Sequence, residues 1–138
     1  EEIETGLKSA FFYLDDIVNN IKKKFEVNTD QISILGFSQG SMLATYYALQ
    51  NENTFQNIFS LSGSLPNQIL EKLELKKNNI KYLIFHGKID DVVSPNQALE
   101  THNFLINQKI ESQIIIDENC GHSISPLAIE AINNKFKN

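Results

Sequence analysis

A serine placed between two glycines is the first feature of this sequence that could do chemistry. In the segment "GFSQG", Ser38 lies two residues after Gly36 and two residues before Gly40. A serine hydroxyl becomes a strong nucleophile only when a histidine accepts its proton and a carboxylate orients that histidine. Ser38 is therefore a candidate nucleophile only if the chain supplies both partners.

The chain has three histidines that could act as the base. His102 lies within a helical pattern, which favours an ordinary surface position. His86 ends an apolar run just before a glycine, and we interpret it as a brace for the following loop rather than a proton carrier. His122, in the loop segment "CGHS", is the predicted base.

The acid is sought among aspartates that follow apolar runs. Asp90 and Asp91 are adjacent in "HGKIDDVVSP", and either could face the histidine. Asp117 is a rival, but it lies close to His122 in sequence and is more simply read as capping its own loop. The chain order Ser38, Asp90, His122 is the order of the triad in α/β-hydrolases.

The elements that must position these residues alternate between helices and strands. Apolar residues three and four apart predict a helix through the opening stretch, on one face formed by Ile3, Leu7, Phe11, Leu14, Val18, Ile21 and Phe25. Strands are predicted over 31–35, 57–61, 80–85 and 112–116. Further helices are predicted over 40–50 (ended by "NENT"), 68–75 (weakly), 95–107 and 126–136.

This alternation predicts an α/β fold, a three-layer sandwich with a mostly parallel sheet. The carboxyl ends of parallel strands meet at one edge, so the loops carrying Ser38, Asp90 and His122 should converge there. Between a strand and a helix, Ser38 would occupy a strained turn that its flanking glycines relieve. The N–H of Gln39 would then point at a developing oxyanion.

Composition limits the kinds of partner. With 138 residues, 41% hydrophobic and 21% charged, the chain is typical of one soluble globular domain. A net charge of -5 without a basic stripe argues against nucleic acid and anionic membrane surfaces. No apolar run is long enough to span a membrane. The single cysteine, Cys120, excludes an internal disulfide, is interpreted as a small, partly buried hydrophobe and fits a reducing, cytoplasmic setting.

Four blocks of the sequence resemble the phospholipase/carboxylesterase family of α/β-hydrolases, which includes the acyl-protein thioesterases. They are "DQISILGFSQGSMLA", "SLSGSLP", "HGKIDDVVSP" and "GHSISPLAIEAI", and the resemblance covers essentially the whole chain. It implies Ser38 as nucleophile, His122 as base and Asp90 as acid, with no metal or cofactor. Asp91 stands where the family commonly has proline. Ser41 replaces a frequent glycine, a change that the start of the helix should absorb.

The resemblance also implies that residues 1–138 form a single α/β-hydrolase domain lacking its N-terminal strands. The loop that carries the family's second oxyanion donor would be absent, and the strand over 31–35 would be an open edge. We expect either a fragment of a longer enzyme or a shortened homologue that pairs as a homodimer. The start of the sequence inside a helical pattern favours the fragment.

Two functions are compatible with these features. The first is a serine hydrolase that cleaves small carboxylic esters or thioesters through an acyl-enzyme on Ser38. The second is a catalytically inactive, hydrolase-like module that binds acyl groups or a partner protein. Acyl-chain length and the preference between ester and thioester are not predicted.

Overall fold

The architecture is that of alternating helices and strands. The structure, a computed structural model, describes residues 2–51, 55–76 and 79–137. In chain order the elements are α1 (Glu2–Phe25), a 3₁₀ turn (Thr29–Gln31), β1 (Ser33–Phe37), α2 (Gln39–Leu49), β2 (Asn57–Leu61), α3 (Asn67–Leu70), β3 (Lys81–Gly87), α4 (Pro95–Asn107), β4 (Glu111–Asp117) and α5 (Pro126–Asn134). Residues 52–54, where "NENT" was expected to end a helix, lie outside the described residues.

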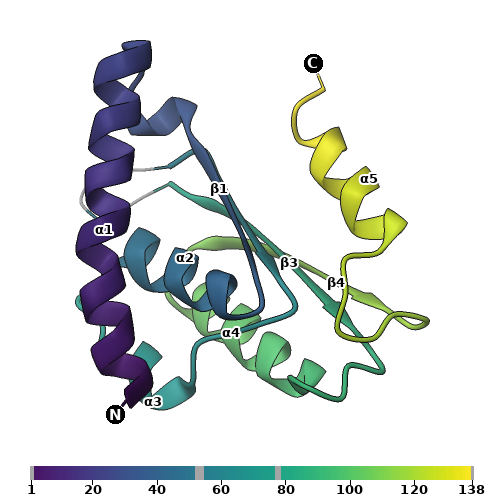
Figure 1. The fold of residues 1–138 in the computed structure, drawn as a ribbon. Coiled ribbons are helices and arrows are strands. Elements are labelled where there is room, and N and C mark those ends of the chain that lie inside the picture. Colours follow the sequence, from purple (N-terminus) through teal and green to yellow (C-terminus); the bar gives the residue numbers. More distant parts are fainter. Residues whose placement is uncertain (1, 52–54, 77–78, 138) are drawn as a thin grey trace.

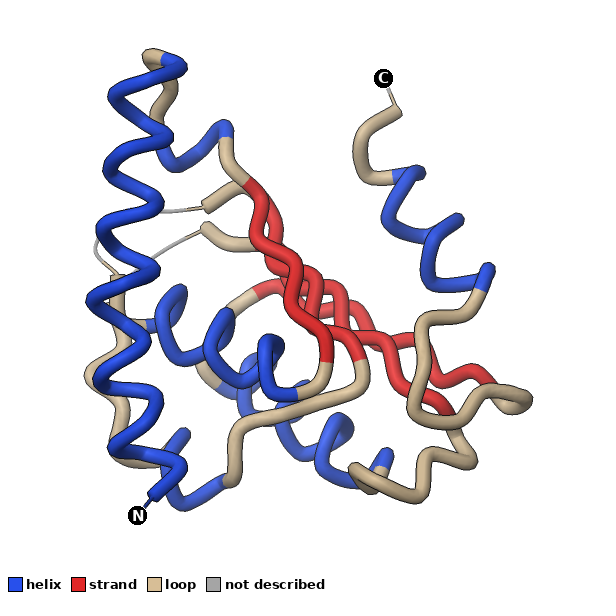
Figure 2. Tube along the Cα trace, viewed as in Figure 1, coloured by secondary structure: helices blue, strands red, loops and turns tan. Residues whose placement is uncertain are grey.

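The four strands form one parallel sheet in the order β1-β2-β3-β4. Their carboxyl ends are in register, with Phe37 paired to Leu61, Leu61 to Phe85 and Phe85 to Ile115. Figure 2 shows that the loops leaving these ends gather on the same side of the sheet. The predicted α/β class and parallel sheet are confirmed.

Helices cover both faces of the sheet. Figure 1 shows α1, α2 and α4 on one face and α5 on the other. The first face holds the larger core cluster, which includes Tyr47, Ile58 and Ile84, and the second holds Leu61, Phe85, Cys120 and Ala128. Every residue of β2 is buried, as is expected of an inner strand covered on both faces.

The outermost strand β1 is less covered than its neighbours. It pairs only with β2 within the described sheet. The side chain of Leu35, in the middle of this strand, is 51% exposed. An apolar strand edge of this kind can pair with another strand.

The opening helix follows its predicted pattern only in its middle. Leu7 and Val18 are buried, whereas Ile3 and Phe25 are 48% and 62% exposed. The reason is length, since α1 has 24 residues and α2, against which it packs, has 11. The C-terminal end of α1 therefore extends beyond the shorter helix, whereas Ile3 at the other end lines an open groove beside the start of α2.

The weak helix predicted over 68–75 is wrong in its second half, because α3 ends at Leu70. The chain then leaves the helix, and the N–H of Lys76 donates to the carbonyl of Leu49 at the end of α2. Leu73 and Leu75 pack against the larger core cluster from this non-helical segment. Tertiary packing thus overrides the local helical pattern.

The first strand is shifted from its prediction over 31–35. Residues Thr29–Gln31 form the 3₁₀ turn, closed by a capping box between Asn28 and Gln31. The strand therefore begins at Ser33 and runs through Gly36 to Phe37.

No helix among the described residues is long and apolar enough to cross a membrane.

Candidate active site

Ser38 lies in the turn that joins β1 to α2. Its backbone has φ 55° and ψ −118°, a conformation that is unfavourable for any residue except glycine. Two sets of bonds hold it there. The Ser38 N–H donates to the carbonyl of Leu61 at 2.8 Å, and the Ser38 carbonyl accepts from the N–H and Oγ of Ser41.

The two glycines that flank Ser38 play different parts. A Cβ added to Gly36 would overlap the backbone of Gly40 and Ser41, so only glycine fits there. A Cβ added to Gly40 would meet nothing within 4 Å, so the expectation that both glycines relieve crowding is wrong for Gly40. The close contact on the other side comes from Gly63, where an added Cβ would overlap the Ser38 carbonyl and Ser41 Oγ.

Ser41 stands where the related family often has glycine. Its side chain is fully buried and its hydroxyl donates to the Ser38 carbonyl at 2.6 Å. The start of α2 therefore absorbs the hydroxyl, as expected. The residue adds one more hydrogen bond to the strained turn.

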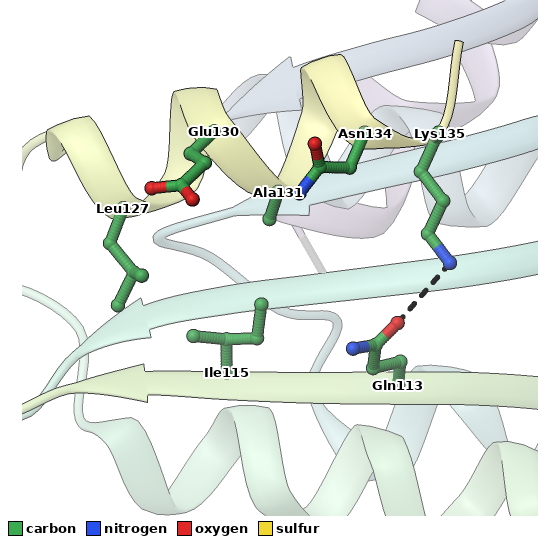
Figure 3. Close-up of a pocket in the computed structure, with 7 residues that line it drawn as sticks. All are labelled: Gln113, Ile115, Leu127, Glu130, Ala131, Asn134 and Lys135. Carbon is green, nitrogen blue, oxygen red and sulfur yellow. Dashed lines mark hydrogen bonds between the residues drawn. The ribbon is translucent and has the colours of Figure 1, made fainter. Parts of the chain in front are cut away.

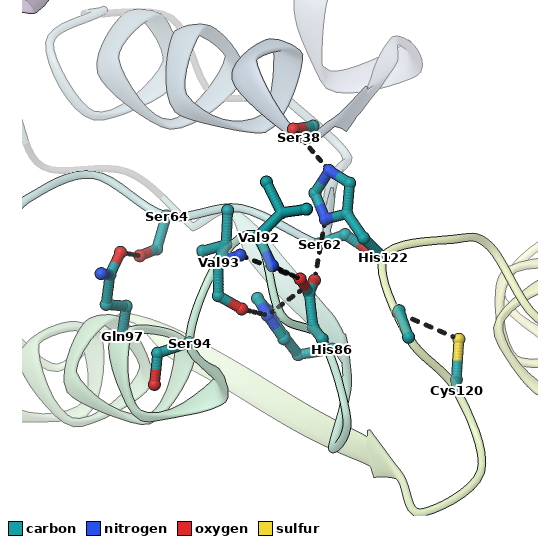
Figure 4. A network of polar contacts seen from close by, with 12 residues as sticks. Ser38, Ser62, Ser64, His86, Val92, Val93, Ser94, Gln97, Cys120 and His122 are labelled. Atoms are coloured by element: carbon teal, nitrogen blue, oxygen red, sulfur yellow. Dashed lines mark hydrogen bonds and ion pairs between the residues drawn. The ribbon is translucent and has the colours of Figure 1, made fainter.

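His122 reaches Ser38 from the loop after β4. Its Nε2 lies 2.9 Å from Ser38 Oγ (Figure 4), and its ring lies 5.1 Å from the ring of Phe37. The loop is fixed by backbone and hydroxyl contacts. The N–H of Ile89 donates to the carbonyl of Cys120, and Ser62 Oγ donates to the carbonyl of Ser123 at 3.3 Å.

Asp90 completes the chain of hydrogen bonds. Its Oδ2 lies 2.8 Å from His122 Nδ1, and its Oδ1 accepts the N–H groups of Val92 and Val93, both at 2.9 Å. A carboxylate at Nδ1 places the imidazole proton there and leaves Nε2 free to accept the Ser38 proton. In this tautomer, Nε2 faces Ser38 Oγ as the proton acceptor that a nucleophilic serine would need.

The environment keeps Asp90 ionised. Burial acts to raise the pKa of this carboxyl, but the N–H of Val93, the His122 side chain and the N–H of Val92 outweigh it. The net result is a pKa below the usual range for aspartate. An ionised Asp90 can stabilise the imidazolium form of His122.

The other candidate residues take no part in the hydrogen bonds that link Ser38 to His122 and His122 to Asp90. Asp91 is exposed to solvent. Asp117 accepts the N–H of Asn119 at 3.0 Å and so caps its own loop, as interpreted from the sequence. His102 Nδ1 lies 2.7 Å from Ser112 Oγ, a half-buried contact between α4 and β4. His86 is fully buried against Asp90, which fits its interpretation as a brace.

Cys120 is buried two residues before His122. Its thiol lies 3.4 Å from the carbonyl oxygens of Gly121 and Ser123. It therefore packs within the histidine loop and is more deeply buried than the partly buried side chain that the sequence predicted. Among the described residues, no group of three histidine, cysteine, aspartate or glutamate side chains could hold a metal ion.

Sequence reasoning missed residues that close the site through their backbone or their size. Ser62, just after β2, has a positive φ of 56° while its side chain anchors the histidine loop. A Cβ on Gly87, the last residue of β3, would overlap the carbonyls of Cys120 and Gly121. The available signals were a serine directly after the predicted strand over 57–61 and a glycine two residues after the predicted strand over 80–85.

An apolar groove of about 340 Å³ begins beside the elbow and runs between α1 and α2. Gln39 and Gly40 line it next to Ser38, and its other lining includes Ile3, Leu7, Met42 and Leu43. Gln39 also opens α2, so its N–H has no partner within the helix. The groove therefore begins at the start of the helix that follows the nucleophile candidate.

A second pocket lies away from these residues, between β4 and α5. It has about 390 Å³ and is shown in Figure 3, where Lys135 Nζ donates to Gln113 Oε1 at 3.2 Å. Its lining is Gln113, Ile115, Leu127, Glu130, Ala131, Asn134 and Lys135. None of these residues is a nucleophile or a histidine, so the pocket is not part of the candidate site.

Comparisons with known proteins identify the family and the fold of the chain. The sequence profile of a family described as Phospholipase/Carboxylesterase matches residues 1–137. The crystal structure of esterase PE8 superposes with a TM-score of 0.86 at 25% identity, over 94% of this chain and 60% of that protein. A phospholipase/carboxylesterase from Dyadobacter fermentans gives 0.77 at 23% identity, over 95% and 64%.

The carboxylesterase of Bacillus cereus is similar in fold, with a TM-score of 0.79 at 18% identity over 96% of this chain and 63% of that protein. The chain therefore spans less than two thirds of the length of these three solved structures. Its four-stranded parallel sheet and helices match part of an esterase of the α/β-hydrolase class.

Proposed function

Because the chain belongs to the phospholipase/carboxylesterase family, we propose that it is a serine hydrolase that cleaves carboxylic esters or thioesters through an acyl-enzyme on Ser38. The observation that carries the proposal is the hydrogen-bonded alignment of three side chains. Ser38 Oγ, His122 and Asp90 Oδ2 are linked by contacts of 2.9 and 2.8 Å. Nothing in this alignment requires a metal or cofactor.

In the acylation step, Ser38 Oγ attacks the acyl carbonyl carbon while its proton moves to His122 Nε2. Asp90 holds the imidazolium through Nδ1–H. The carbonyl oxygen becomes an oxyanion, which the Gln39 N–H stabilises. When the tetrahedral intermediate collapses, His122 returns the proton to the departing alcohol or thiol.

In the second step, water hydrolyses the acyl-enzyme. His122 accepts a proton from the water, whose oxygen attacks the acyl carbon of the ester on Ser38. The Gln39 N–H again stabilises the oxyanion. Collapse releases the carboxylic acid and restores the hydroxyl of Ser38 with the proton held by His122.

The groove beside Gln39 and Gly40 supports an apolar acyl group as the part of the substrate that is bound. It adjoins the N–H that would hold the carbonyl oxygen, and Leu7, Met42 and Leu43 line it. Burial of apolar groups stabilises a complex by about 0.8 kcal/mol for each methylene. We therefore expect turnover to rise with acyl-chain length until the groove is filled.

Backbone N–H groups that bind the oxyanion contribute much of the rate of such a reaction. In α/β-hydrolases a second N–H from an earlier loop also binds the oxyanion. One such donor is typically worth about 2.7 to 4 kcal/mol of transition-state stabilisation. Among the described residues, the Gln39 N–H is the donor that we assign to this role.

The test is hydrolysis of a series of aryl esters of increasing acyl length and of a long-chain acyl thioester, by the wild type and by Ser38→Ala. The proposal predicts release of acid by the wild type and background rates for Ser38→Ala. Equal rates in the two proteins would contradict it. If both proteins then bound the long-chain acid equally, the acyl-binding module would be the better account.

A further inference from the structure

His86 contacts the same carboxylate as His122 but from inside the protein. It is the penultimate residue of β3, and its side chain is fully buried. Its Nε2 lies 2.8 Å from the carbonyl oxygen of Val93 (Figure 4) and 3.2 Å from Asp90 Oδ2. A carbonyl oxygen can only accept, so Nε2 carries a hydrogen that it donates to Val93, and the same edge of the ring lies against the carboxylate of Asp90.

This contact adds to the polar surroundings of Asp90. Oδ1 accepts two backbone N–H groups, those of Val92 and Val93. Oδ2 accepts from His122 Nδ1 and lies 3.2 Å from His86 Nε2. The buried ring of His86 therefore limits where Oδ2 can lie.

The second nitrogen of His86 shows that this residue is not a proton carrier. Nδ1 is buried and has no hydrogen-bond partner among the described residues. A proton added there would have no acceptor, which is costly in a site without solvent. His122 differs, because its side chain is 19% exposed and touches the hydroxyl of Ser38.

We propose that His86 is a positioning residue for the hydrolysis, in that its ring, fixed by the bond from Nε2–H to the Val93 carbonyl, holds Asp90 Oδ2 at the point where that oxygen accepts the Nδ1–H of His122. The inference rests on the proposed function. His86 acts through Asp90 and touches neither Ser38 nor the substrate. Its N–H to Val93 also ties the loop that carries Asp90 to the end of β3.

The first test is a set of substitutions at position 86, with the rate of Ser38 labelling by a fluorophosphonate as the readout. His86→Leu removes the N–H that binds the Val93 carbonyl and the polar contact with Asp90, and should slow labelling by about ten- to a hundredfold, the usual effect of leaving a buried polar group without its partner. His86→Gln places an amide N–H near the position of Nε2 and should recover most of the rate. His86→Asn places it near Nδ1 and should not.

A matched control is His102→Leu. It removes a histidine that bonds to Ser112 between α4 and β4, away from Asp90. Labelling should stay at the wild-type rate. Thermal unfolding of all four variants identifies any loss of rate that follows a general loss of fold.

The second test separates positioning from a merely structural role. In an Asp90→Asn background, His86→Leu should cause no further loss of labelling rate, because its route of action is gone. Additive losses would overturn the proposal. Equal rates for His86→Leu and His86→Gln would overturn it as well.

A readout that needs no turnover is the low-field proton NMR signal of the His122 Nδ1–H. It should be present in the wild type and His86→Gln, and lost or shifted in His86→Leu. An identical signal in all three would contradict the positioning role. If the wild type shows this signal but no labelling, the proposed function fails and the role of His86 toward Asp90 stands.

Discussion

The two halves of the candidate site are held in place by different forces. On the acid–base side, Asp90 and His122 are fixed by polar contacts, with three hydrogen-bond donors and the His86 ring around the carboxylate of Asp90. On the elbow side, Ser38 is fixed mainly by close backbone packing around Gly36 and Gly63. Removing a polar atom from the acid–base side should therefore lower the activity of Ser38. Adding a carbon on the elbow side should destabilise the turn that holds Ser38.

Substitution of His122 should have the largest effect. His122→Gln removes the base from Ser38 while leaving the polar loop in place. The labelling rate of Ser38 should fall on the order of 10⁴- to 10⁶-fold, as loss of the base does in other serine hydrolases. Thermal unfolding should change little. A loss of less than tenfold would show that Ser38 does not depend on this histidine.

Substitution of the acid should have the next largest effect on the labelling rate. Comparing Asp90 with its neighbour Asp91 decides which of the two is the acid. Asp90→Asn should slow labelling by about 10⁴-fold, because the amide favours the wrong tautomer of His122. Asp91→Asn is the matched control, since Asp91 is exposed and should leave the rate unchanged. The opposite result would assign the acid to Asp91.

The elbow side is tested with its two glycines. Gly36→Ala should destabilise the fold by about 1 to 3 kcal/mol, because the new Cβ overlaps the backbone of Gly40 and Ser41. Gly40→Ala should be neutral or slightly stabilising, since the site is open and alanine favours helix. Urea unfolding measures both. Equal losses of stability would contradict the steric account of the elbow.

The smallest expected effect is a pH dependence of stability that comes from the acid–base side. The folded pKa of Asp90 lies below its unfolded value of about 3.9. Its ionised form therefore stabilises the protein above about pH 4, and that contribution is lost as the pH falls through the folded pKa. The difference in unfolding free energy between wild type and Asp90→Asn should shrink from pH 7 to pH 3. A constant difference would mean that Asp90 is not the responsible group.

The arrangement of the three polar residues could be anticipated because parallel strands share one edge. Ser38, Asp90 and His122 each follow a predicted strand. Once those strands were recognised, the three residues could be expected to lie together without any knowledge of side-chain packing. Their roles remain a proposal. The same strand pattern also gave the α/β class, which the sheet and the family match confirm.

What the sequence could not supply depends on single contacts. The choice between Asp90 and Asp91 depends on which side chain the loop turns inward. The close approach of Gly63 to Ser38 joins residues that follow different strands, and the end of α3 at Leu70 follows from packing of the next segment. None of these leaves a periodic signal in the sequence.

The most direct measurement is the site of a fluorophosphonate adduct, located by mass spectrometry of peptides from the labelled protein. The account predicts one adduct on the hydroxyl of Ser38 in the wild type, and almost none in His122→Gln after the same time. No adduct in the wild type, or an adduct on a different residue, would contradict the claim that Ser38 is the activated nucleophile.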